Sequence, residues 1–388
     1  MKKVVILTRS LLNPLTKEFS VGGVQTYIQD LAHLCVKSKY DTVVYQLVDS
    51  DVASCELNIG NYRVHFFPDK KKNGKHSNQY AFDAIYTAEN ITNCLFIIAT
   101  DWLGIKSTHN NVIHIQHGIA FDDSTYYKDK EQHLIKRYKY RFDRLHNCIK
   151  SIKRFQHVKN AVCVDYNFFN WYRTMGTIYP DNHLCVIPNY SGNFISESEV
   201  EHKLNNRNKS KSIIFARRFF DYRGTLLFAE VAERLLKEFP DIEIAFAGDG
   251  PLKDLLITRF KEEARVSIFS YMAKDSVQIH QRYDIAVVPT IYSEGTSLAL
   301  CEAMAAACFP IATHVGGMTN IILDEYNGFL SYPDIERFHQ ACRKALLLSD
   351  DAFNTICLNA YHSARCSFSR EKWEKTWYEY IERLFETL

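Results

Sequence analysis

Two glutamates, Glu294 and Glu302, stand eight residues apart in the most informative segment of the chain. Residues 283–290, directly before them, form an apolar run closed by a proline, which is typical of a short buried strand. Residues 298–307 are rich in Leu, Ala, Met and Glu, which favour a helix. Glu294 is therefore expected in the loop between a strand and a helix, with Glu302 on the helix.

The residues between the two glutamates can bind an anion. Gly295, Thr296 and Ser297 would open the helix, where unpaired N–H groups and the positive end of the helix dipole attract phosphate. Eight residues are a little over two helical turns, so Glu302 faces roughly the same side as the loop. Carboxylates accept hydrogen bonds from hydroxyl groups, and sugars and riboses supply such groups. The segment therefore predicts a site for phosphate and sugar hydroxyls.

If the two glutamates stood alone, the better interpretation would be one glutamate in a loop and one on a solvated helix face, without a function. The residues around them favour a binding site instead. Residues 310–313 look like the next strand, and Gly316 and Gly317 follow it. This order of strand, Glu-Gly loop, Ala-rich helix, strand and Gly-Gly turn resembles the retaining GT-B glycosyltransferases of family 4. Their signature is Glu-x7-Glu, an Ala-Met-Ala helix and a Gly-Gly loop, and the match runs for more than thirty residues.

Composition bounds the class of protein. A chain of 388 residues exceeds the size of a single core, so two domains are expected. A net charge of +2 gives no general argument for nucleic acid or an anionic membrane. The apolar stretch after Met1 is too short for a signal peptide, and no apolar run approaches the ~20 residues of a membrane span. The eleven cysteines are scattered without a Cys-x-x-Cys, which favours reduced thiols in a cytoplasmic protein.

Strands and helices alternate through both halves of the chain, which predicts an α/β protein with two parallel sheets. In the first half the expected strands are 3–8, 42–48, 94–99, 112–115, 161–164 and 185–187. In the second half the expected strands before residue 283 are 212–216, 242–247 and 266–269. The polar residues 204–212 read as a linker.

The expected fold is therefore GT-B, with two Rossmann-like domains that face each other across a cleft where ligands bind. The N-terminal, acceptor-side domain would span residues 1–203, and the C-terminal, nucleotide-sugar domain 204–368. The resemblance implies that a final helix, about 369–388, crosses back onto the first domain.

Glycines and cations precede the two predicted helices that would meet phosphate. Gly22 and Gly23 lack a Cβ and allow close backbone approach, although a simple turn explains a lone Gly-Gly about as well. The resemblance implies that this loop approaches the donor diphosphate. Arg218 and Arg223 have the spacing of the two cations of the family, and they would stabilise charge on a leaving diphosphate. The alternative is a surface salt-bridge pair. Arg217 stands where the family has glycine, and Arg223 stands where it has lysine.

Three further positions are assigned through the resemblance. His117 ends a buried strand and resembles the histidine that faces the transferred sugar. Ser270 and Tyr271 occupy the stretch that contacts the base, with Ser270 in place of the usual glycine. Asn320 replaces a customary glutamate, and we expect little catalytic cost.

The one strongly biased segment is 127–159, with eleven basic residues against three acidic ones and interleaved aromatics. A basic, aromatic helix over 128–159 suits an anionic membrane surface or a lipid-phosphate acceptor. A solvated helix face is an equally good interpretation. No nucleic-acid reading motif accompanies the charge.

The sequence thus predicts a retaining, metal-independent glycosyltransferase that moves a sugar from a nucleotide-sugar to a saccharide or lipid-linked saccharide, in assembly of a surface polysaccharide or glycolipid. Arg218 and Arg223 would hold the diphosphate, Glu302 the ribose, Glu294 the sugar, and His117 the reactive face. No metal and no cofactor are expected, because cations and helix N–H groups replace a divalent ion. The expected place is the cytoplasm or the inner face of the membrane.

Two other classes of protein are compatible with parts of the pattern. A catalytically lapsed nucleotide-binding subunit that supports a partner glycosyltransferase would explain the departures at Arg217, Ser270 and Asn320. Retention of both glutamates and of both cations argues against it. An NAD-dependent dehydrogenase also has two such lobes, but its Gly-x-Gly-x-x-Gly is missing after the first strand.

Overall fold

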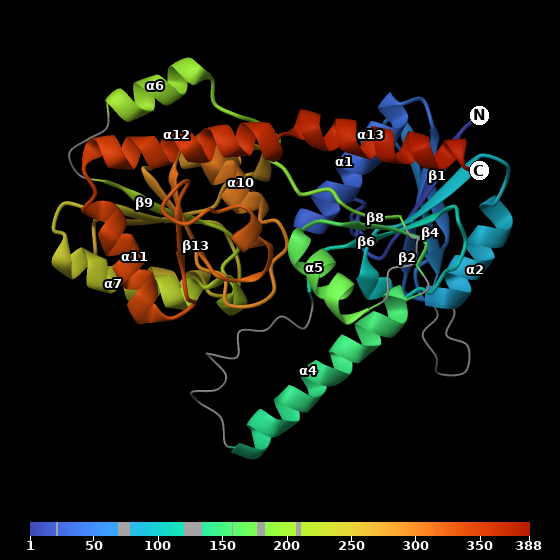
Figure 1. Ribbon diagram of the computed structural model, residues 1–388, viewed down its shortest axis with the longest axis horizontal. Coiled ribbons are helices and arrows are strands. Elements are labelled where there is room, and N and C mark those ends of the chain that lie inside the picture. The colour runs from blue at the N-terminus through green and yellow to red at the C-terminus, as the bar shows by residue number, and fades with distance from the viewer. Residues whose placement is uncertain (21, 69–77, 120–133, 157, 177–182, 207–210) are drawn as a thin grey trace. The chain divides into compact units, whose positions relative to one another are not determined.

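The computed structural model describes residues 1–388 except 21, 69–77, 120–133, 157, 177–182 and 207–210 (Figure 1). Its contacts divide the chain into two compact units. The first contains residues 1–117, 145–188 and 373–388, and the second contains residues 118–144 and 189–372. Each unit has its own largely parallel sheet, so the α/β class and the two parallel-sheet domains are confirmed.

The first sheet has the strand order β3-β4-β2-β1-β5-β6-β7-β8. Its strands are β1 (Lys3–Thr8), β2 (Asp41–Val48), β3 (Cys55–Ile59), β4 (Tyr62–Pro68), β5 (Cys94–Ile98), β6 (Val112–Gln116), β7 (Asn160–Cys163) and β8 (His183–Val186). All recorded pairings in it are parallel except the one between β3 and β4. The central strands are buried along nearly their whole length, because a parallel sheet is covered on both faces.

The helices of the first unit pack against this sheet. They are α1 (Gly23–Lys37), α2 (Asn78–Glu89), α5 (Tyr166–Met175) and the larger part of α13 (Arg370–Glu386). Trp377 of α13 donates a hydrogen bond from Nε1 to the hydroxyl of Tyr27 on α1, at 2.8 Å. The ring of Trp373 lies edge-on to Tyr27, with 5.2 Å between centroids. The last helix of the chain is therefore held against α1.

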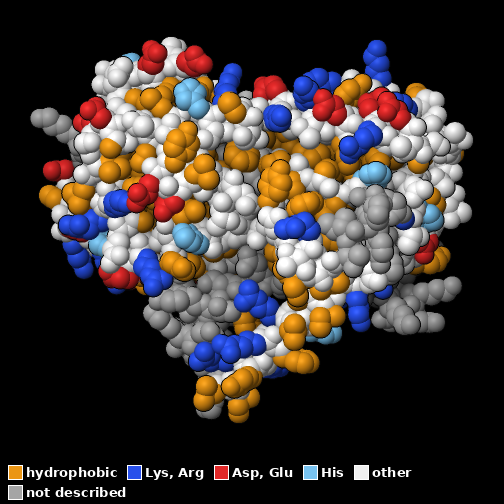
Figure 2. All heavy atoms as spheres, in the orientation of Figure 1, with side chains coloured by type: hydrophobic (Ala, Val, Ile, Leu, Met, Phe, Trp, Pro, Cys, Tyr) orange, Lys and Arg blue, Asp and Glu red, His pale blue; other side chains and the backbone are white. Residues whose placement is uncertain are grey.

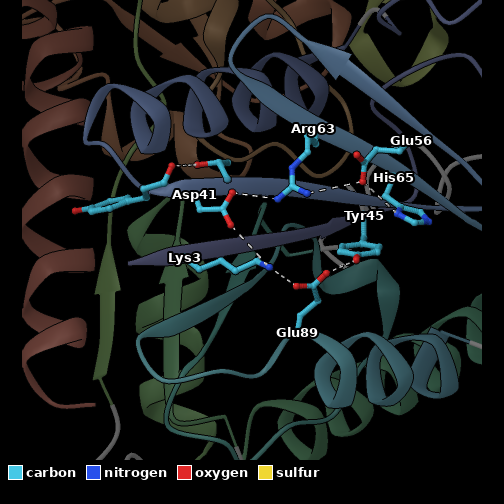
Figure 3. Close-up of polar contacts among 9 residues, drawn as sticks. Lys3, Asp41, Tyr45, Glu56, Arg63, His65 and Glu89 are labelled. Carbon is cyan, nitrogen blue, oxygen red and sulfur yellow. Dashed lines mark hydrogen bonds and ion pairs between the residues drawn. The ribbon is translucent and has the colours of Figure 1, made fainter. Parts of the chain in front are cut away.

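A polar network lies at the amino-terminal edge of the first sheet (Figure 3). Lys3 and Asp41 begin β1 and β2, and Glu89 ends α2. Lys3 forms an ion pair with Glu89, and the hydroxyl of Tyr45 donates to the same carboxylate. Arg63 of β4 donates to Asp41 at 3.1 Å. The network connects the starts of three strands to the end of one helix.

The second sheet has six parallel strands in the order β11-β10-β9-β12-β13-β14. They are β9 (Ile213–Ala216), β10 (Ile244–Ala247), β11 (Val266–Phe269), β12 (Ile285–Val288), β13 (Phe309–Thr313) and β14 (Phe329–Ser331). Counted along the chain this is the order 3-2-1-4-5-6 of a dinucleotide-binding fold. The strand order reverses between β9 and β12, where such sheets bind ligands at the carboxyl ends of their strands.

The helices of the second unit are α6 (Glu197–Asn205), α7 (Thr225–Glu238), α8 (Lys253–Arg259), α9 (Ser276–Gln281), α10 (Leu298–Ala305), α11 (Ile335–Leu346) and α12 (Asp350–Ser367). The boundary expected between residues 203 and 204 falls inside α6. This helix begins at a capping box of Ser196 and Glu199 and belongs to the second unit. Helix α10 is rich in alanine, and its small side chains allow close packing, so that Ala303 and Ala305 are fully buried.

The helix α4 (Leu134–Phe155) contains most of the basic segment (Figure 1). Residues 128–133 and 157 of that segment lie outside the described residues. Only Phe155 of the helix is fully buried. Among the described residues, no helix combines the length and the apolar character that crossing a membrane requires.

Candidate functional site

Four polar side chains meet at the carboxyl ends of β9 and β12, where the strand order of the second sheet reverses. Arg217 directly follows β9, and Arg223 follows a few residues later, at the end of a single 3-10 turn. Thr290 and Glu294 follow β12. The sheet topology therefore places these side chains where a parallel α/β sheet binds its ligand.

Glu294 is the centre of this cluster. Its Oε2 accepts hydrogen bonds from Arg217 Nη2 at 2.7 Å, from Arg223 Nη1 and from Thr290 Oγ1 at 3.1 Å. Arg217 also donates to Thr290 from its other terminal nitrogen. The side chains of Arg217 and Glu294 are only 5% and 10% exposed. Oε1 of Glu294 has no recorded partner among the described residues, so one carboxylate oxygen carries the whole cluster.

The charges in the cluster keep Glu294 ionised. Burial by itself would raise the pKa of Glu294, but Arg217 and Arg223 lower the pKa to about 2. Two guanidinium groups then face one carboxylate, which leaves one positive charge in excess. A buried excess of positive charge favours an anionic ligand.

Two glycines allow the backbones around the cluster to approach closely. Gly316 has φ +54°, and a Cβ there would lie 1.9 Å from the carbonyl oxygen of Glu294. The N–H of Gly317 donates to that same oxygen at 2.9 Å. Gly248 has φ +152°, and a Cβ there would lie 2.0 Å from the carbonyl oxygen of Arg217. The Gly-Gly turn predicted after β13 thus holds the backbone of Glu294 in position.

The segment after Glu294 forms a helix that starts where the sequence predicts it. Helix α10 begins at Leu298, with Ser297 as its N-cap residue. Ser297 is 1% exposed, and its hydroxyl has no hydrogen-bond partner in the described part of the chain. Asn189 donates to the carbonyl oxygen of Thr296 at 2.6 Å and fixes this loop. The start of α10 therefore carries polar groups that its own helix does not use.

Glu302 has a different hydrogen-bond partner from the side chains of this cluster. Its Oε2 accepts a hydrogen bond from Ser276 Oγ at 2.6 Å. Burial raises the pKa of Glu302, against the hydrogen bond from Ser276 and the charge of Arg217. Burial also raises the pKa of Tyr271 to about 12, and the charge of Glu302 adds to that shift. The two glutamates are thus held by different partners, as separate roles require.

The remaining predicted residues of the second unit lie at the surface or near it. Ser270 is exposed. Its hydroxyl donates a hydrogen bond to Asp249 at 2.9 Å and accepts one from Lys253 at 2.7 Å. Arg218 is exposed, and its guanidinium lies 5.6 Å from the centre of the Phe220 ring. Asn320 is exposed as well. No ion pair of Arg218 is recorded among the described residues.

Arg217 is the residue that sequence reasoning missed, together with Thr290 and Ser276. The structure brings Arg217 to Glu294, where we had expected Arg218 beside Arg223. The two arginines are adjacent after β9, and the structure buries Arg217 and exposes Arg218. Nothing in their residue types distinguishes them.

The predicted residues of the first unit lie at the carboxyl ends of its strands and at the start of α1. His117 follows β6, and its Nε2 lies 2.9 Å from the carbonyl oxygen of Ala99 after β5. Burial lowers the pKa of His117 to about 4, against the hydrogen bond to Ala99, so the ring is neutral near pH 7. Gly22 is the N-cap residue of α1, and Gly23 is its first residue. A Cβ on Gly22 would lie 2.2 Å from the side-chain oxygen of Gln25.

In the part of the chain that the structure describes, no group of three or more His, Cys, Asp or Glu side chains has the arrangement of a metal site. The cations and N–H groups described above can stabilise a developing negative charge.

Part of the second unit matches a known protein family. Residues 196–356 match the family model of the glycosyl transferases group 1. The chain is 24% identical over 274 residues to the UDP-Gal:alpha-D-GlcNAc-diphosphoundecaprenol alpha-1,3-galactosyltransferase of Escherichia coli. That match covers 67% of this chain and 65% of the relative, which is just under two thirds of its length.

Solved structures resemble the whole chain. The sucrose-phosphate synthase of Thermosynechococcus elongatus has a TM-score of 0.73 at 14% identity, with both chains covered completely. An Anabaena protein solved in complex with UDP-glucose has a TM-score of 0.66 at 15% identity, again over 100% of both chains. The fold of the chain is GT-B, and its residues 196–356 match the family model of the group 1 glycosyl transferases.

Proposed function

We propose that this protein is a retaining, metal-independent glycosyltransferase that transfers a sugar from a nucleotide-sugar to an acceptor. The observation that carries the proposal is the cluster of Arg217, Glu294 and Arg223, with its excess positive charge at the switch point of the second sheet. A nucleoside diphosphate gains negative charge as the glycosidic bond breaks, and arginines already oriented in a buried site stabilise that charge.

The free oxygen of Glu294 suits the transferred sugar. All its recorded hydrogen bonds use Oε2, so Oε1 can accept hydrogen bonds from sugar hydroxyls. Arg217 and Arg223 would meanwhile stabilise the diphosphate, together with the N–H groups of Gly295 to Ser297 and the exposed guanidinium of Arg218. Gly22 and Gly23 would approach the same diphosphate through their backbone.

Glu302 suits the ribose for the same reason. Only Oε2 has a recorded hydrogen bond, from Ser276, and Oε1 can accept from ribose hydroxyls. Ser270 and Tyr271 lie after β11, the edge strand of the same sheet, where the base of the nucleotide would be bound. The neutral ring of His117 donates from Nε2 to Ala99, so its Nδ1 would accept a hydrogen bond from a hydroxyl at the reactive face of the sugar.

The proposed reaction forms the new bond on the same face from which the old one leaves. The bond between the anomeric carbon and the diphosphate oxygen breaks, and the acceptor hydroxyl oxygen bonds to that carbon. The proton of the hydroxyl passes to the departing phosphate. In this scheme the protein supplies positioning and charge stabilisation and forms no covalent intermediate.

The acceptor is proposed from the relative in Escherichia coli, whose name specifies a sugar on diphosphoundecaprenol. We propose a saccharide or lipid-linked saccharide acceptor in the assembly of a surface polysaccharide or glycolipid. All eleven cysteines are free, which suits a reducing compartment, so the proposed place is the cytoplasm.

A thermal-shift panel with UDP, GDP, ADP and dTDP tests the proposal and finds the nucleotide. The cognate diphosphate at about 100 times its Kd stabilises the folded protein by about 2.7 kcal/mol. The proposal fails if none of the four, nor any of their sugar conjugates, raises the melting temperature.

Transfer from the matching nucleotide-sugar is then measured with excess EDTA, and the anomeric configuration of the product is read by NMR. We expect full turnover in EDTA and the same anomeric configuration as in the donor. Complete loss of turnover that Mn²⁺ restores would contradict metal independence, and an inverted product would contradict the retaining reaction.

A further inference from the structure

Exposed apolar side chains form a stripe along α4. Ile135, Tyr138, Phe142, Leu145 and Ile149 are between 44% and 75% exposed. They are spaced alternately three and four residues apart, so they fall on one face of the helix. Figure 2 shows hydrophobic and basic side chains next to each other along this helix. A continuous apolar face of this kind marks a surface that binds something.

Cations flank the stripe on both sides. At about 100° per residue, Arg141 falls on one side of it and Lys139 and Lys150 fall on the other. All three side chains are exposed. The whole helix contains eight lysines and arginines and one acidic residue, Asp143. The face that α4 offers is therefore both apolar and strongly positive.

The C-terminal end of α4 is fixed by packing. Phe155 is buried, and its ring lies 4.8 Å from that of Phe168 and 5.9 Å from that of Tyr172. Arg154 donates from Nη1 to the carbonyl oxygen of Asp101 at 2.7 Å. The helix is thus attached firmly at one end, while its stripe continues over the exposed turns.

We propose that α4 is a docking helix that lies in the plane of a bilayer surface containing anionic lipids. Charge decides the occupant: a second copy of the helix would bring two strongly positive faces together, whereas acidic headgroups neutralise them. Ile135, Phe142 and Ile149 would enter the boundary of the acyl chains, and the lysines would reach the headgroups. The proposal goes beyond sugar transfer and does not depend on it.

Flotation with lipid vesicles tests the docking surface without any donor or acceptor. The full chain is mixed with vesicles of phosphatidylcholine alone or with about 30% phosphatidylglycerol. We expect binding to the anionic vesicles only, weakened by high salt. The variant Lys139→Glu, Arg141→Glu, Lys150→Glu should bind at least about tenfold more weakly, since each cation near the surface is worth about fivefold in affinity.

A matched control places the same three charge reversals elsewhere. Lys106, Lys237 and Lys261 are exposed and lie outside α4. Their replacement by glutamate should change vesicle affinity far less than the α4 variant does. An equal loss in both variants would show that net charge alone binds the vesicles, and would overturn the assignment to α4.

A second variant tests the apolar stripe at constant charge. Phe142→Ser with Ile149→Ser should also lower binding to anionic vesicles at least about fivefold, while the circular dichroism spectrum is unchanged. Equal binding of the wild type to neutral and anionic vesicles, or no binding to either, would overturn the proposal. A lipid-free dimer that this variant dissociates would show that a second copy covers the stripe. Retention on polyglutamate without vesicle binding would indicate an acidic protein partner instead.

Discussion

Glu89 lies at the amino-terminal edge of the first sheet, and Glu294 lies at the carboxyl edge of the second. Both carboxylates are partly buried, and both form ion pairs with cations. They differ in how their oxygens are used. Glu89 accepts from Lys3 on Oε2 and from Tyr45 on Oε1, so both oxygens are satisfied (Figure 3). Glu294 accepts two arginines and Thr290 on Oε2 alone.

The comparison shows that burial and pairing do not by themselves mark a functional site. The local pair of Lys3 and Glu89 balances one positive with one negative charge. The cluster around Glu294 has two positive charges for one negative, and one carboxylate oxygen remains available. The first arrangement suits the connection of strands to a helix, and the second suits the binding of an anion that carries hydroxyl groups.

The largest expected effect is on turnover, from the arginines of the second cluster. Arg217→Ala and Arg223→Ala should each lower kcat by about 10²-fold or more, as for removal of a donor that stabilises charge in a transition state. Arg218→Ala is the matched control from the adjacent position, and its exposed side chain predicts a smaller loss. Steady-state assays at saturating donor measure all three. A wild-type kcat in the Arg217 variant would remove Arg217 from the site.

The next effect is on stability, from the first cluster. Lys3→Met leaves Glu89 without its cation, and we expect a loss of about 1.5–3 kcal/mol in the free energy of unfolding. The kcat of the folded enzyme should stay that of the wild type, because the pair lies at the amino-terminal edge of its sheet. Urea denaturation and the transfer assay read the two effects separately. A large fall in kcat at unchanged stability would contradict the structural role of this pair.

The smallest effect is the dependence of stability on pH. Burial by itself would raise the pKa of Glu89, but hydrogen bonds from Lys3 and Tyr45 lower it below the ordinary value of 4.5. A lowered pKa in the folded state gives stability that is complete above pH 4.5 and is lost as the pH falls. Glu89→Gln should therefore reduce the loss of stability on acidification below that point. Unchanged acid dependence would contradict this, as measured by urea denaturation at several pH values.

Acidification acts on Glu294 in the same direction. The pKa of Glu294 is about 2, because the two arginines outweigh burial, so its contribution to stability is complete above the ordinary value of 4.5 and is lost progressively as the pH falls from there toward 2. Between about pH 5 and pH 8, Glu294 stays ionised and should add no pH dependence to nucleotide binding. Calorimetry across this range checks the point by comparing the wild type with Glu294→Gln.

The sequence predicts the two sheets because their central strands are continuous apolar runs between helical segments. It does not predict β3 and β4. In β3, exposed and partly buried residues alternate over five positions of an antiparallel edge strand, which gives a weak signal. The segment from Glu294 to Glu302 is predicted well, since its turn and helix are encoded locally in glycine, serine and alanine.

The pairing of Glu294 with Arg217 is beyond the sequence for a physical reason. Arg217 and Arg218 are adjacent after the end of β9, and only the folded backbone there decides which guanidinium reaches Glu294. The same holds for Ser276, whose contact with Glu302 joins residues from two different helices. Contacts between separate elements depend on packing, which local propensity does not determine.

The central claim is that the cations of the second cluster hold the diphosphate while the free oxygen of Glu294 holds the sugar. Isothermal calorimetry of the free nucleoside diphosphate with Glu294→Gln tests it most directly, with Glu302→Gln as the companion variant. Glu294→Gln removes a negative charge next to both arginines, so diphosphate affinity should stay the same or rise while transfer falls sharply. Glu302→Gln should weaken diphosphate binding by roughly one to two decades, the worth of a hydrogen bond to a charged group. Loss of diphosphate binding in Glu294→Gln as severe as in Glu302→Gln would contradict the claim and leave Glu294 as a support for its loop.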